Sequence, residues 1–215
     1  MQHPSRTDDA QARDLVGLPD FFTDGLLAET PVATTAGWIA VSHLRPGDRL
    51  LTFDGGPAEV VELRRTRTTP DAGEWPSDHW PLAVPPQPGV QGPGLRLLPD
   101  QLVLIDTDLA EAMFGDPFAL VPSRALEGWA GIARSLPRAA EAAIVPVFER
   151  EQLIYAGGGT LVHCPGQVAP DLTGPAVYAP LSLAAARQLV ACLMAEEVGA
   201  ALVRATPGMD HAALG

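Results

Sequence analysis

The chain has 215 residues, of which 47% are apolar and 19% charged, and its formal net charge is −12 at pH 7. It contains no lysine and no asparagine. This excludes Schiff-base lysines, phosphate-loop lysines, N-glycosylation and any self-cleavage that uses asparagine cyclisation. The acidic balance argues against a nucleic-acid partner, because phosphate recognition depends on clustered positive charge.

Residues 1–20 are polar and show little apolar periodicity, which predicts a flexible N-terminal arm. The arm holds no apolar segment of the length that a secretory signal needs. No stretch of the sequence is long and apolar enough to span a membrane. We therefore expect a cytoplasmic protein without membrane contact, and export by a different kind of signal stays open.

Between about residue 21 and residue 165, short β-prone runs alternate with turn residues. Many of the 21 glycines and 22 prolines lie between these runs. The turn Asp54-Gly55-Gly56 predicts a β-hairpin, because glycine reaches the positive φ angles of tight hairpin turns. The pattern predicts an all-β fold with strands at Thr30–Thr35, Trp38–Ser42, Arg49–Phe53, Ala58–Thr68, Trp80–Val84, Leu95–Leu98, Gln101–Ile105, Phe118–Val121, Ile144–Glu149, Gln152–Ala156 and Thr160–Cys164.

The segment 70–94 contains seven prolines and four glycines, and it predicts a long excursion from the sheet. The run Trp80–Val84 is the one interruption that we expect in it. Two interpretations are open: a surface loop pinned by Trp75 and Trp80, or a segment that binds a partner.

A single long helix is predicted near the C-terminus, where Ser182 is a suitable N-cap and the apolar spacing continues to about Arg204. Apolar residues at spacings of three and four indicate that one face of this helix packs on the protein. Cys192 lies toward that face and is interpreted as a small buried apolar residue.

We expect neither a cofactor nor a bound metal. Cys164 and Cys192 are 28 residues apart, which is neither a disulfide framework nor a zinc-ligand spacing. Asp106, Asp108 and Glu111 could join a calcium site, but the glycine and closing glutamate of an EF-hand loop are lacking. These three acids are therefore interpreted as solvated turn residues.

Five sequence blocks follow one another in a recognisable order. Residues 44–52 read Leu-Arg-Pro-Gly-Asp-Arg-Leu-Leu-Thr, which is the most diagnostic block, and residues 163–166 close the series with His-Cys-Pro-Gly. Over about residues 25–166 the series resembles the bacterial Hint domain, the Hedgehog/intein fold. The resemblance implies a twisted Hint-like β domain at 21–170 and a C-terminal helical extension at 171–215. The other blocks are residues 29–37, 98–104, 118–126 and, as the last block together with residues 163–166, residues 147–158.

The resemblance also implies a reaction. In members that process themselves, a cysteine thiol attacks the preceding peptide and a histidine protonates the departing nitrogen. The cysteine position falls on Gly25, the histidine position on Gln101, and a further histidine position on Glu151. We therefore expect a degenerate member without self-splicing or autoproteolysis. It would act in binding or assembly, with a protein partner or with a second copy of itself.

The alternative is a residual autoprocessing domain. Thr23 could accept an acyl group from Phe22 if a base lay beside its hydroxyl. His163 and Cys164 are an imidazole and a thiol side by side in sequence, but neighbouring residues on a regular strand point to opposite faces. A third interpretation is an accessory partner of an active Hint-bearing protein.

Overall fold

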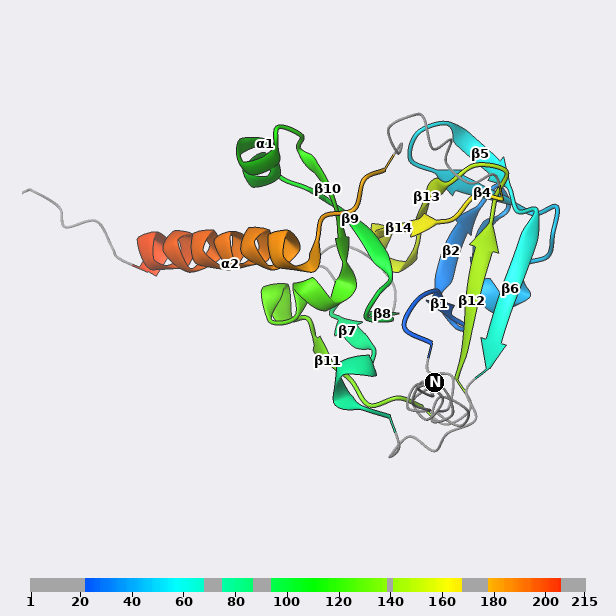
Figure 1. The fold of residues 1–215 in the computed structure, drawn as a ribbon, viewed down its shortest axis with the longest axis horizontal. Coiled ribbons are helices and arrows are strands. Elements are labelled where there is room, and N and C mark those ends of the chain that lie inside the picture. Colours follow the sequence, from blue (N-terminus) through cyan, green and yellow to red (C-terminus); the bar gives the residue numbers. More distant parts are fainter. Residues whose placement is uncertain (1–21, 68–74, 87–93, 139–140, 168–177, 206–215) are drawn as a thin grey trace, which may run out of the picture.

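The computed structural model describes residues 22–67, 75–86, 94–138, 141–167 and 178–205. Figure 1 shows a body of antiparallel strands from which one long helix extends. The helices are α1 (Asp108–Phe114) and α2 (Leu183–Ala205). The strands in the described residues are β1 (Leu26–Leu27), β2 (Pro31–Thr34), β3 (Gly37–Ala40), β4 (Arg49–Thr52), β5 (Gly56–Glu59), β6 (Glu62–Arg67), β7 (Leu82–Val84), β8 (Leu95–Leu97), β9 (Leu102–Asp106), β10 (Phe118–Pro122), β11 (Ala133–Arg134), β12 (Ala142–Val147), β13 (Gln152–Tyr155) and β14 (Leu161–Cys164).

The strands form two sheets, and every ladder between named strands is antiparallel. One sheet has the order β11-β7-β8-β1-β12-β6. The other has the order β10-β9-β14-β13-β4-β2-β3, with β5 paired to β4. Each of the eleven predicted runs contributes a strand, so the all-β prediction is confirmed. The two shortest strands, β1 and β11, were not predicted, because two residues leave no periodicity to detect.

The predicted run Ala58–Thr68 is not one strand but two, and its interruption is where the chain changes sheets. Val60 donates its N–H to Asp48 O at 2.9 Å, on the side of β4. The next residue, Val61, donates to Val147 O at 2.8 Å, on the side of β12. Two adjacent residues therefore hydrogen-bond to different sheets. Because the β-prone sequence is continuous at this point, the sequence did not indicate where the chain passes from one sheet to the other.

The predicted hairpin is confirmed. Strands β4 and β5 pair in the register Arg49↔Glu59 to Thr52↔Gly56, and Gly56 has φ +83°. A residue with a side chain is disfavoured at this backbone angle, whereas glycine adopts it freely. The turn chemistry therefore sets the register of this pair.

The interpretation of Asp106, Asp108 and Glu111 as turn residues is wrong, and Asp106 is the last residue of β9. Asp108 and Glu111 lie in the first turn of α1, a helix that the sequence analysis did not predict. Thr107 caps it by accepting the Leu109 N–H at 3.3 Å, and Gly115 ends it with φ +83°. Seven residues are too few for a clear helical period, but Thr107 and Gly115 were usable capping signals.

Helix α2 begins as predicted: the Ser182 hydroxyl accepts the Ala185 N–H at 3.2 Å. Its first turns pack into the main core against η4 (Ser123–Leu126) and α1 through buried apolar residues, namely Ala186, Leu189, Val190 and Leu193. The expectation of one continuous packed face is wrong beyond this point, because Met194 and Val198 are 38% and 60% exposed. Cys192 is half-buried rather than buried. The outer half of α2 extends away from the sheets in Figure 1, and Trp129 contacts it by donating its indole N–H to Glu197 Oε1 at 2.9 Å.

The segment 70–94 lies partly outside the described residues, as does the whole of the predicted arm at 1–20. Within the described part, Trp75 is buried and its ring meets Phe22 edge-on at 5.4 Å. The Trp80 indole donates to Trp75 O at 3.0 Å, and β7 joins the six-stranded sheet between β8 and β11. No helix among the described residues combines the length and hydropathy needed to cross a membrane.

Candidate functional site

The positions singled out by the sequence meet where the two sheets face each other. Gly25 precedes β1 of the six-stranded sheet, whereas Gln101 precedes β9 and Cys164 ends β14 in the other sheet. All three line one cavity of about 410 Å³ together with His163 and Asp24. Tertiary structure thus brings together Gly25 and Cys164, which are 139 positions apart in the sequence.

Gly25 is buried with φ +99°, an angle that favours glycine. A Cβ atom placed on it would lie 2.9 Å from Val145 Cγ2 and 3.4 Å from Ile144 O. Both neighbours belong to β12, which pairs with β1. The space that a nucleophilic side chain would need at this position is therefore taken by the sheet itself.

Gln101 is 2% exposed and its side chain serves as a clamp. The Nε2 amide donates to Leu102 O at 3.0 Å and to His163 O at 2.9 Å. This ties the beginning of β9 to β14 across the ladder that joins them. A carboxamide does not exchange protons near neutral pH, so the contribution of Gln101 here is geometric.

His163 and Glu151 form a pair on the neighbouring rim. The His163 Nε2 lies 3.0 Å from Glu151 Oε2, with 17% and 19% of the two side chains exposed. A carboxylate only accepts, so Nε2 carries the proton and donates it to this bond. The sequence analysis named both residues separately. Their pairing was not predicted, because they meet only through the β13–β14 hairpin.

Cys164 lies on the opposite face of β14 from His163, as the alternation along a strand predicts. It is 2% exposed. Burial raises the pKa of its thiol, and the negative charge of Asp24 raises it further. The thiol is therefore protonated at neutral pH, and no hydrogen bond in the described residues joins it to a base.

Asp24 is a member of the site that the sequence analysis missed. Its Oδ1 accepts the Gly25 N–H at 2.7 Å. The residue is exposed at the cavity mouth, but protein atoms around its carboxyl group displace water and raise its pKa. The Gly25 N–H and the charge of His163 act in the opposite direction, and Asp100 adds to the increase. The sequence could have indicated Asp24 through its position directly before residue 25, where the family places its cysteine.

Thr23 is not among the residues that line the cavity. Its backbone carbonyl accepts the Asp100 N–H at 2.6 Å. In the part of the chain that the structure describes, no ionisable side chain hydrogen-bonds to its hydroxyl. Likewise, no group of three or more His, Cys, Asp or Glu side chains gathers as metal ligands among the described residues.

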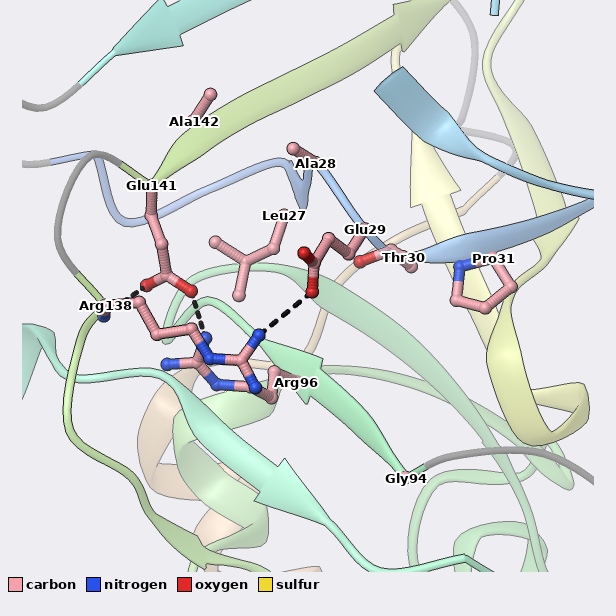
Figure 2. A pocket seen from close by; sticks show the side chains of 10 residues that line it. All are labelled: Leu27, Ala28, Glu29, Thr30, Pro31, Gly94, Arg96, Arg138, Glu141 and Ala142. Atoms are coloured by element: carbon pink, nitrogen blue, oxygen red, sulfur yellow. Dashed lines mark hydrogen bonds and ion pairs between the residues drawn. The ribbon is translucent and has the colours of Figure 1, made fainter. Parts of the chain in front are cut away.

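A second cavity, of about 320 Å³, lies between β8 and the two segments that precede β2 and β12. Figure 2 shows Arg96 and Arg138 directed into it, each joined to a glutamate. Arg96 pairs with Glu141, with 16% and 11% of the side chains exposed. Arg138 pairs with Glu29 at 2.9 Å, with 63% and 85% exposed.

Among solved structures, the chain is similar to the solution structure of a bacterial intein-like domain from Clostridium thermocellum. The identity is 14% and the TM-score 0.44, over 66% of this chain and 99% of that one. It is also similar to a crystal structure of the MchDnaB-1 intein, with 18% identity and a TM-score of 0.40, over 65% of this chain and 98% of that one.

No curated protein matches the chain. The profile of the Hint domain family matches residues 25–161. This match begins at the buried glycine before β1 and ends at the first residue of β14, so it contains the strands β1 to β13. It covers more than half of the 215 residues, and the chain therefore belongs to the Hint domain family.

Proposed function

We propose that this Hint domain has lost acyl-shift self-cleavage and splicing, and that it acts in binding or assembly. The observation that carries the proposal is the state of residue 25. It has no side chain, and β12 occupies the space where a side chain would stand. Nucleophilic catalysis needs an attacking group within reach of the carbonyl and a base to activate it.

The other polar groups of the cavity support the same proposal. The side-chain amide of Gln101 donates to two backbone carbonyls, and His163 donates to Glu151. Cys164 is buried and its raised pKa keeps the sulfur protonated, which makes it a poor nucleophile. Asparagine cyclisation is excluded because the sequence contains no asparagine.

The binding role is supported by α2, whose outer half presents Met194 and Val198 to solvent. Exposed apolar side chains on a helix that leaves the body suit contact with another protein. A reducing compartment such as the cytoplasm fits the two cysteines, Cys164 and Cys192, both of which are free thiols.

Intact mass measurement tests the loss of self-cleavage. The purified chain, incubated with and without dithiothreitol or hydroxylamine, is expected to keep its full mass, because neither reagent finds a thioester or ester to attack. The variant Gly25→Cys with Gln101→His and Val145→Ala restores the nucleophile, the proton donor and the space, and serves as the positive control. Cleavage of the unmodified chain near residues 22–25 or 163–166 would contradict the proposal.

A further inference from the structure

The cavity of Figure 2 combines two positive and two negative side chains, Arg96 and Arg138 with Glu29 and Glu141. Its volume, about 320 Å³, lies at the small end of the range of ligand pockets. It shares no lining residue with the cavity beside Gly25, so a ligand bound here is independent of the proposed loss of self-cleavage. The other lining residues are mostly small or apolar, namely Leu27, Ala28, Thr30, Pro31, Gly94 and Ala142.

One of the two ion pairs is fixed in place. Besides its pair with Glu141, Arg96 donates from Nε to Ser135 Oγ at 3.3 Å and from Nη2 to Leu136 O at 2.9 Å. Glu141 in turn accepts the backbone N–H of Arg138 at 3.0 Å through Oε2. Because these contacts hold both side chains and bury most of their surface, the pair of Arg96 and Glu141 keeps its position when a ligand enters.

The other ion pair is free to open. Arg138 Nη1 donates to Glu29 Oε2 at 2.9 Å, and both side chains are more than half exposed. An exposed pair of this kind contributes little to stability, because water and salt screen it. Separating Arg138 from Glu29 therefore costs little, and it provides a hydrogen-bond donor and an acceptor of opposite charge at the mouth of the cavity.

We propose that this cavity binds a free α-amino acid with an apolar side chain. The carboxylate of the ligand accepts from the Arg138 guanidinium, and its ammonium group donates to the Glu29 carboxylate. The ligand thus replaces one ion pair by two charge-assisted contacts. Its side chain lies against the apolar part of the lining, which includes Leu27 and Pro31.

The balance of charge selects this class of ligand. The four charged side chains cancel, so a ligand with a single charge would leave one charge unpaired where water is partly displaced. A carboxylate without an ammonium group would also be repelled by the net charge of −12 on the chain. A zwitterion adds one charge of each sign and keeps the balance, and the small volume favours a single amino acid over a peptide.

Titration calorimetry of the full chain tests the site with L-leucine as the probe. 4-Methylpentanoate lacks the ammonium group of leucine, and 3-methylbutylamine lacks its carboxylate. We expect L-leucine to bind at least about tenfold more tightly than either compound, because each of them loses one charge-assisted contact. The midpoint of thermal unfolding, which rises when a ligand binds the folded state, measures the same binding independently of its heat. Equal affinities, or no response to millimolar L-leucine in both measurements, overturn the proposal.

Two variants assign the charges to the ligand. Glu29→Gln should weaken binding of L-leucine about tenfold without weakening that of 4-methylpentanoate, which has no ammonium group to lose a partner. Arg138→Gln should weaken L-leucine by a similar factor without weakening 3-methylbutylamine.

The matched controls are Glu62→Gln and Arg64→Gln, which remove one partner of an exposed ion pair on β6 and should leave all affinities unchanged. If the variants at 29 and 138 do not differ from these controls, or if they weaken all three ligands by the same factor, the proposal is overturned. Self-cleavage detected by intact mass, with binding of L-leucine intact, would contradict the proposed function alone.

Discussion

The two cavities of the molecule are lined by polar groups of different kinds. In the cavity beside Gly25, the Gln101 amide donates to a backbone carbonyl and His163 pairs with Glu151. The thiol of Cys164 is buried. In the cavity of Figure 2, two arginines face two glutamates. The first arrangement holds strands in register, whereas the second balances charge through one largely buried and one exposed ion pair. The difference shows that polar groups in a cavity can serve the structure alone, and that a reactive site needs at least one group that no such contact holds.

The sharpest way to break this comparison is to measure thiol reactivity. Cys192 is half-buried and should be alkylated by iodoacetamide, whereas Cys164 is buried and should react more slowly by orders of magnitude. Burial raises the pKa of the Cys164 thiol, which lowers its thiolate fraction, and burial also blocks the reagent. Peptide mass spectrometry of timed samples measures both sites. Equal rates in the folded chain would mean that the cavity exposes a reactive sulfur, and unfolding in urea should make them equal.

The second prediction concerns the packing around residue 25. Gly25→Ala should lower the free energy of unfolding by about 2–5 kcal/mol. A positive φ costs about 1–2 kcal/mol for a residue with a side chain, and overpacking against Val145 costs about 1–3 kcal/mol. Urea denaturation measures the loss.

Gly55 provides the matched control for this substitution, because a Cβ there meets nothing within 4 Å and its φ is not positive. Gly55→Ala should change the free energy of unfolding by at most about 0.5 kcal/mol. A double-mutant cycle with Val145→Ala should show coupling between residues 25 and 145. If Gly25→Ala is as harmless as Gly55→Ala, the position can take a side chain and the argument for lost chemistry fails.

The third and smallest effect separates the two ion pairs of the second cavity. Arg96→Ala should lower the free energy of unfolding by about 2 kcal/mol, because it leaves Glu141 partly buried without this partner. Arg138→Ala removes an exposed pair and should cost about 0.5 kcal/mol or less. Thermal unfolding at low and high salt distinguishes them, since only the exposed pair is strongly screened. Equal losses in the free energy of unfolding would show that the two ion pairs do not differ in effective burial.

The sequence by itself determined the local elements whose cause is local. Alternating apolar residues and turn glycines predicted the strands, Ser182 predicted the beginning of α2, and the Hint-like blocks led to Gly25, Gln101 and Glu151. The alternation along β14 also predicted that His163 and Cys164 would face apart. Each of these properties depends on residues that are close together in the chain.

Tertiary structure decided what each group meets. The change of sheets between Val60 and Val61, the pairing of His163 with Glu151, and the closure of the space at Gly25 by Val145 all depend on contacts between distant segments. The same holds for α2, where the apolar spacing continues past Leu193 but the body that could bury it ends. A sequence pattern indicates that a helix face is apolar, but only the folded structure shows whether another part of the chain packs against that face.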